Sequence, residues 1–259
     1  MKLRMDVADG RKLTATELRA KYVAKNRPVI LRGAASRWAT GELWTEAYLR
    51  QRCGERTLTV RSAESAAFHG ETGYATATLT VNELLDAIGS TSPVGALLPY
   101  AAQVPLRSAL PELDADARPP PAHLAALGAR LRGAPAAYIG GGSTTPLHFD
   151  ALENLLVVVR GRKDVTLWHP QHSALLYPRD DGAAAIFSRA DIYHPDFDAF
   201  PLLRDALPLG LRAELSAGDA LYLPRRWWHA VKSPSGQLNV SLSYWTQPVD
   251  EGDGGASVT

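Results

Sequence analysis

The sequence has little cysteine, no long apolar segment and no excess of charge of either sign. Its 259 residues include one cysteine, Cys53, which excludes an intrachain disulfide and gives no sign of an oxidising compartment. The longest aliphatic run, residues 155–159, is too short to cross a bilayer, and the first residues lack the apolar core of a signal peptide. Lys and Arg total 28 against 27 Asp and Glu, which disfavours a dedicated nucleic-acid or polybasic membrane binder. We therefore expect a cytoplasmic protein without membrane association.

The sequence does contain enough apolar residues for a large core. Hydrophobic residues make up 46% of the chain and charged residues 21%, a balance typical of globular proteins. We expect a single domain over residues 1–249, with a mixed α/β portion at 1–134 and a strand-rich core at 135–246. Residues 250–259 are small, polar and rich in glycine, which predicts a disordered tail.

The strand-rich part reads as a mainly β sandwich or barrel, because short β-patterned segments are separated by turn residues. Residues 155–159 and 163–168 flank Gly161 and are predicted to pair as a hairpin. In the last strand, larger apolar residues alternate with serines. If this strand lines the barrel, the serines face the interior and the apolar residues pack outward against covering helices. The apolar residues are Val240, Leu242 and Tyr244, and the serines are Ser241 and Ser243.

The first candidate for chemistry is a His-x-Asp pair. His148 and Asp150 lie two positions apart in an extended segment, so an imidazole and a carboxylate point to the same face. A single pair of this kind is also common on protein surfaces without any metal. It therefore needs a third group to indicate a metal site.

His229 supplies a third group if it lies nearby. It follows two tryptophans just after a strand and a proline. Taken alone, it is better explained as a core histidine bonded to backbone. Joined to His148 and Asp150 it forms a 2-His-1-carboxylate facial triad, the set that holds Fe(II) and leaves positions open for oxygen and a chelating co-substrate.

Lys163 is a further signal, because it lies in a strongly apolar segment. An ammonium that faces inward needs an anionic partner, and the distal carboxylate of a metal-chelating dicarboxylate would provide one. The alternative is a solvated lysine at the first position of an edge strand.

Together these motifs resemble the Jumonji-C, cupin-like 2-oxoglutarate oxygenases, in particular the branch of the asparaginyl hydroxylase of hypoxia-inducible factor. The resemblance covers about residues 27–245 in the order of the family. It implies a double-stranded β-helix (jelly-roll) core with N-terminal α/β elements and covering helices. The matching pieces are residues 27–34 (RPVILRGA), 100–103 (YAAQ), 145–150 (TPLHFD), 154 with 161–163 (GRK), 218–224 (GDALYLP) with 227–229 (WWH), and 243–245 (SYW).

The resemblance also implies roles for individual residues. His148, Asp150 and His229 match the iron ligands. The residues that match the 2-oxoglutarate site are Lys163, for the distal carboxylate, with Thr145 and Tyr100 assisting, and also Asn154 and Ser243. Ser243 stands where the related asparaginyl hydroxylase has asparagine. As residues that border the substrate we consider Trp228, Trp245 and His194.

The implied reaction is hydroxylation of a C–H bond of a protein or peptide side chain, with succinate and CO₂ as co-products. The alternatives are hydroxylation of a small molecule or a modified tRNA base, a cupin metalloenzyme that does not use 2-oxoglutarate, and an inactive binding module. Lys163 and Thr145 weigh against the enzyme without 2-oxoglutarate, and the three competent ligand positions weigh against the binding module. The net charge weighs against a nucleic-acid substrate. The sequence leaves the oligomeric state and the choice between hydroxylation and demethylation open.

Overall fold

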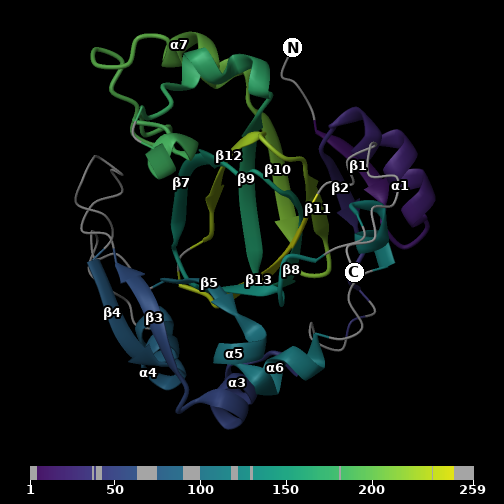
Figure 1. The fold of residues 1–259 in the computed structure, drawn as a ribbon. Helices are drawn as coiled ribbons and strands as arrows, with labels where there is room; N and C mark the ends of the chain where they lie inside the picture. The colour runs from purple at the N-terminus through teal and green to yellow at the C-terminus, as the bar shows by residue number, and fades with distance from the viewer. Residues whose placement is uncertain are drawn as a thin grey trace, which may run out of the picture.

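Two β-sheets face each other in the computed structural model of the chain (Figure 1). The structure describes residues 5–36, 38, 43–62, 75–89, 100–117, 122–128, 131–180, 182–234 and 236–247. The tail expected at 250–259 lies outside these residues. No helix in the described part of the chain is long and apolar enough to span a membrane.

The core consists of eight consecutive strands that alternate between the two sheets, except that β9 and β10 are neighbours in the same sheet. Four of them lie side by side in the larger sheet in the order β6-β13-β8-β11, and four form the smaller sheet in the order β10-β9-β12-β7. This is a double-stranded β-helix, as the sequence predicts. The strands are β6 (Ala136–Gly140), β7 (Thr144–Phe149), β8 (Glu153–Arg160), β9 (Arg162–Trp168), β10 (Leu211–Ser216), β11 (Ala220–Leu223), β12 (Trp228–Lys232) and β13 (Asn239–Thr246).

The N-terminal part of the chain extends the larger sheet at both edges, so that it has nine strands. The parallel pair β1 and β2 is added beside β11, and β5, β3 and β4 are added beside β6. These strands are β1 (Asp6–Asp9), β2 (Val29–Arg32), β3 (Thr57–Ser62), β4 (Ala75–Thr80) and β5 (Tyr100–Pro105).

Helices cover the outer faces of the sheets. In Figure 1, α3, α5 and α6 gather below β5 and β13, whereas α7 lies at the opposite end of the molecule. Buried leucines of α1, α3, α4, α5 and α6 join one apolar cluster with the outward residues of the larger sheet. The α-helices are α1 (Ala15–Lys21), α3 (Glu46–Cys53), α4 (Val81–Gly89), α5 (Leu106–Ala109), α6 (Pro111–Asp116) and α7 (Leu203–Ala206), and the 3₁₀ helices are η1 (Val23–Lys25), η2 (Ala122–Ala126), η3 (Pro170–Leu176), η4 (Gly182–Ile186) and η5 (Leu207–Leu209).

The hairpin predicted for residues 155–159 and 163–168 is wrong. β8 pairs with β11 and β13, whereas β9 pairs with β10 and β12 in the other sheet. The chain turns at Gly161, which has a φ of 76°, and crosses from one sheet to the other. β8 is apolar over residues 155–159 because both of its faces are buried there. Its odd-numbered residues, such as Val157, face the covering helices, and Leu156 and Val158 face the space between the sheets.

The register predicted for the last strand is confirmed. Val240, Leu242 and Tyr244 belong to the cluster that packs against the covering helices. Ser241 and Ser243 line a pocket between the sheets. All five residues are buried, so burial alone does not distinguish the two faces of the strand. The alternation of side chains along the strand does distinguish them.

Replacing Leu242 with Ala tests this register. Leu242 is fully buried among the covering helices, so we expect the substitution to lower the free energy of unfolding by about 2–5 kcal/mol, the usual cost of such a cavity. Urea denaturation measures this change. Ser243→Ala, on the opposite face, serves as the control and should cost about 1 kcal/mol or less. Equal losses in the two variants would contradict the assigned faces.

Candidate metal centre

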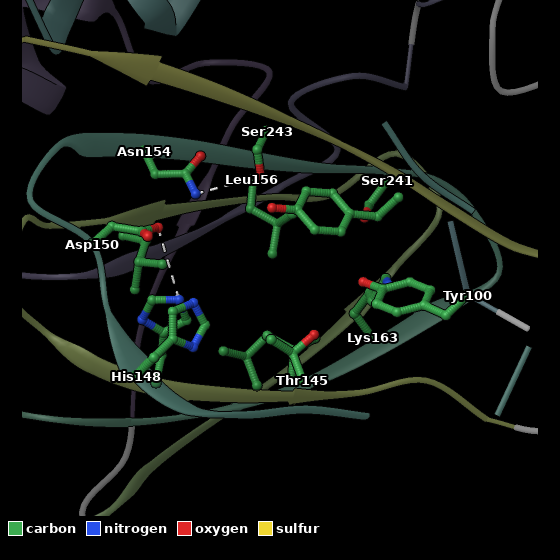
Figure 2. Close-up of a pocket in the computed structure, with 14 residues that line it drawn as sticks. Tyr100, Thr145, His148, Asp150, Asn154, Leu156, Lys163, Ser241 and Ser243 are labelled. Atoms are coloured by element: carbon green, nitrogen blue, oxygen red, sulfur yellow. Dashed lines mark hydrogen bonds and ion pairs between the residues drawn. The ribbon is translucent and has the colours of Figure 1, made fainter. Parts of the chain in front are cut away.

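The three residues predicted as metal ligands lie together at one end of the pocket between the sheets (Figure 2). His148 is on β7, Asp150 follows the end of that strand, and His229 is on β12. β7 and β12 are paired with His148 directly opposite His229, which puts the two ring centroids 4.1 Å apart. One ligand atom from each of the three residues lies within 4.8 Å of the other two, and His229 Nε2 is 4.0 Å from Asp150 Oδ2. The strand pairing therefore brings together Asp150 and His229, which are 79 positions apart in the sequence.

Both imidazoles are held by backbone carbonyls two residues earlier in the chain. His148 Nδ1–H donates to the Pro146 carbonyl at 2.8 Å, and His229 Nδ1–H donates to the Trp227 carbonyl at 3.0 Å. Because a carbonyl only accepts, these contacts place the proton on Nδ1 and leave the lone pair of each Nε2 for a metal. Burial and the neighbouring His148 ring lower the pKa of His229, which keeps its imidazole neutral.

Asp150 is held both by its side chain and by its backbone. Trp245 Nε1–H donates to the carboxylate Oδ2 at 3.1 Å, and Arg226 N–H donates to the backbone carbonyl at 2.7 Å. Arg226 has a φ of 66°, a left-handed conformation that is uncommon for residues other than glycine, so the β11–β12 turn stores strain where it meets the ligand.

A bulge in β7 brings Thr145 into the same pocket as His148. They are three positions apart, so in a regular strand they would face opposite sides. The pairing with β12 advances from Thr145–Val231 to His148–His229, which leaves one extra residue in β7. Pro146 lies in this interval and has no N–H to lose from the ladder. The bulge thus allows three inward-facing side chains on one short segment.

Lys163 is a buried cation without a counter-ion. It is 2% exposed, and burial lowers the pKa of its ammonium to about 8. Its Nζ lies 5.5 Å from the centre of the Tyr100 ring, and no carboxylate in the described part of the chain pairs with it. A buried ammonium is costly unless an anion accompanies it. The pocket side of Lys163 therefore fits an anionic group of a ligand, and Thr145 and Tyr100 line the same pocket.

Polar groups elsewhere in the pocket also have free hydrogen-bonding capacity. Asn154 Nδ2 donates to Ser243 Oγ at 3.4 Å, whereas Asn154 Oδ1 and Ser241 Oγ are buried with no partner in the described structure. The pocket has an empty volume of about 450 Å³, which includes space open to solvent. Every residue predicted to contact the metal or the co-substrate lines it.

Tyr138 also lines this pocket, and the sequence reasoning missed it. Its ring centroid is 6.1 Å from that of Tyr100 and 6.3 Å from that of Trp245. Burial raises the pKa of its hydroxyl well above the usual range, so it is a neutral donor. The alternation of side chains along β6 could have identified it. Ala137 and Ile139 face the covering helices, so Tyr138 between them faces the pocket.

The structure places the three residues predicted to border the substrate in different surroundings. Trp228 is buried on the outer side of the smaller sheet, edge-on to Phe149, and its Nε1–H donates to Ser173 Oγ at 2.8 Å. His194 pairs with Asp191 through a 3.2 Å contact on an exposed segment. Neither is among the described residues that line the pocket. Trp245 instead contacts the ligand Asp150.

Residues 15–252 match the cupin-like domain family, and the chain belongs to that family. Its relatives identify the class as the Jumonji-C oxygenases, which use Fe(II) and 2-oxoglutarate. The chain is 30% identical over 231 residues to lysine-specific demethylase 8 of Danio rerio, a match that covers 88% of this chain and 55% of the relative. It is 28% identical over 235 residues to Jumonji C domain-containing protein 5 of Drosophila melanogaster, a match that covers 88% of this chain and 57% of the relative. The chain thus spans about half the length of these relatives.

The residues of the pocket fit the two groups that this family uses. Two imidazole nitrogens and one carboxylate oxygen, all presented from one side, form the donor set that suits Fe(II) and leaves coordination positions open. The buried Lys163 ammonium, which has no carboxylate partner among the described residues, suits the far carboxylate of 2-oxoglutarate. His148, Asp150 and His229 would hold the metal, and Lys163 would hold the co-substrate.

Replacing His148 with Ala tests the metal centre. Two remaining ligands hold a divalent ion poorly, so we expect tight binding of Fe(II), or of Mn(II) as an air-stable substitute, to be lost. Calorimetric titration measures the affinity. His172→Ala, at a histidine that lies outside the pocket, is the control. Tight metal binding by the His148 variant would contradict the assigned ligand set.

Replacing Lys163 with Met separates a ligand-binding role from a structural one. The variant keeps a similar volume but removes the uncompensated charge, so the free energy of unfolding without ligand should not fall. The affinity for 2-oxoglutarate should weaken roughly tenfold to a hundredfold, the value of a charge-assisted contact. Calorimetry and urea denaturation of both proteins measure the two quantities. A destabilised variant with unchanged affinity would make Lys163 a structural residue.

The pKa of Lys163 predicts a pH dependence of stability. It is about 8 in the folded protein, against 10.5 for an unperturbed lysine. Between these values the unfolded state holds a proton that the folded state has released, so this group makes the free energy of unfolding rise with pH over the interval. Denaturation of wild type and Lys163→Met at several pH values measures this contribution as the difference between the two curves. Parallel curves would contradict the lowered pKa.

Proposed function

We propose that the chain is an Fe(II)- and 2-oxoglutarate-dependent oxygenase that hydroxylates a C–H bond of a protein or peptide side chain. The observation that carries this proposal is the position of Lys163. A buried ammonium without an anionic partner lies in the same pocket as the 2-His-1-carboxylate cluster. A cupin metalloenzyme without 2-oxoglutarate would have no use for this costly charge.

Each part of the pocket has a separate task in the proposed reaction. Lys163, with the hydroxyls of Thr145 and Tyr100, binds the distal carboxylate and so fixes the end of the co-substrate that lies far from the metal. Asn154 and Ser243 offer further polar groups in the same pocket. When bound, iron and 2-oxoglutarate supply the chemistry by which one oxygen atom of O₂ enters the substrate C–H bond and the other enters succinate, with release of CO₂.

The walls of the pocket limit the access of water. Leu156, Val165, Leu223 and Val231 face the interior between the polar ends. Such a lining strengthens the interaction of Lys163 with a carboxylate and protects reactive species from side reactions.

A protein substrate is supported by the names of relatives, several of which are called lysine-specific demethylases. Demethylation is therefore the second candidate, since removal of an N-methyl group begins with hydroxylation of a methyl C–H bond. A small molecule or a modified tRNA base is the remaining alternative for the substrate.

Turnover with defined peptides tests the proposal. Purified protein with Fe(II), ascorbate and O₂ should convert 2-oxoglutarate to succinate, and a reactive peptide should raise the rate. Mass spectrometry of peptides carrying Asn, Asp, His, Arg or methyl-lysine then separates the outcomes, because hydroxylation adds one oxygen and demethylation removes one methyl group. Lys163→Met should lose most turnover at low 2-oxoglutarate. A wild-type protein that binds metal but neither binds nor consumes 2-oxoglutarate would overturn the proposal.

A further inference from the structure

The metal ligands differ in what holds them in place. His148 and His229 are each fixed by a carbonyl of their own strand segment. Within the described part of the chain the carboxylate of Asp150 has no such backbone partner, and its hydrogen bond comes from the indole N–H of Trp245 at 3.1 Å. Trp245 is on β13, 95 residues further along the chain and in the opposite sheet.

From this contact we infer that Trp245 is a positioning residue that sets the orientation of the Asp150 carboxylate toward the metal. The inference rests on the proposed function, since it assigns Trp245 a task in the same metal centre. The indole does not touch the metal. It acts through one carboxylate oxygen, and its role differs from the substrate-bordering role expected for it from the sequence.

The chemistry of the contact explains why the N–H matters. A carboxylate offers two oxygens, and a facial site needs it to use one of them so that other positions stay open. A donor on one oxygen limits rotation of the carboxylate and disfavours binding through both oxygens. Outer hydrogen bonds of this kind orient ligands and typically contribute tenfold to a hundredfold to metal affinity.

The surroundings of Trp245 hold the indole rigidly enough for this task. Along β13, Trp245 pairs with Asn154 of β8, so its backbone is fixed inside the larger sheet. Its ring lies edge-on to Tyr138 at 6.3 Å, and its carbonyl accepts from Arg132 N–H at 2.8 Å. A packing role alone would need the ring but not the N–H, which defines the experiment.

The test replaces Trp245 by β-(3-benzothienyl)alanine, which has sulfur in place of the N–H and nearly the same shape. Co(II) serves as the probe, because its visible absorption reports both affinity and coordination geometry. We expect the dissociation constant for Co(II) to rise roughly tenfold to a hundredfold and the absorption bands to change. The thermal midpoint of the metal-free protein should stay close to that of wild type.

Trp228→Phe is the matched control. Trp228 also donates its indole N–H, to Ser173 Oγ, and it directly precedes the ligand His229, but it lies on the outer side of the sheet. Its replacement should leave Co(II) affinity and absorption as in wild type. Trp245→Phe adds an independent variant, expected to show the same weakened Co(II) binding as the benzothienyl protein.

The outcomes separate the inference from the proposed function. If wild type binds Co(II) and 2-oxoglutarate and the benzothienyl variant binds Co(II) within about twofold of wild type with unchanged bands, the inference is overturned and the proposed function stands. If wild type binds neither, the proposed function and the inference fail together. Weakened Co(II) binding confined to the two Trp245 variants supports the inference.

Discussion

The antiparallel pairing of β7 with β12 is the contact on which the candidate site depends. It puts His148 opposite His229 and makes a metal cluster from residues far apart in the chain. The one-residue bulge in the same pairing is equally important, because it turns Thr145 inward beside Lys163 while His148 and Asp150 keep a common face. A regular strand would have supplied the metal ligands or Thr145, but not both.

Lys163 adds a second constraint, which is energetic. A buried ammonium with no carboxylate partner among the described residues raises the free energy of the protein without ligand, and the aromatic ring of Tyr100 compensates only in part. The fold tolerates it because the surrounding β8, β11 and β13 are buried on both faces and bring a large apolar core. Local instability of this kind is typical of binding sites, where the ligand and not the fold supplies the missing partner.

The local pattern of the sequence predicts which face a side chain uses, and it does this well. Alternation gave the two faces of β13 and the common face of His148 and Asp150. It does not specify which strand lies alongside, and the apolar segment before Gly161 shows why. β8 pairs on both sides with distant strands, so proximity along the chain suggested a hairpin where the chain crosses between sheets. The apolar segment around Lys163 predicted an anionic partner but left a solvated lysine as the alternative, and the family resemblance decided between the two. Tyr138 belongs to no motif that the sequence reasoning used.

Trp228 and Trp245 show that closeness along the chain does not predict which tryptophan contacts a metal ligand. Trp228 directly precedes His229, but successive residues of a strand point to opposite sides, so this neighbour faces away from the pocket. Trp245 has no ligand beside it in the sequence and reaches Asp150 across the barrel. The histidine orientations depend on backbone carbonyls, which most substitutions preserve. The Asp150 carboxylate accepts instead from the side chain of Trp245, so this contact is more exposed to sequence change than the two carbonyl contacts of the histidines.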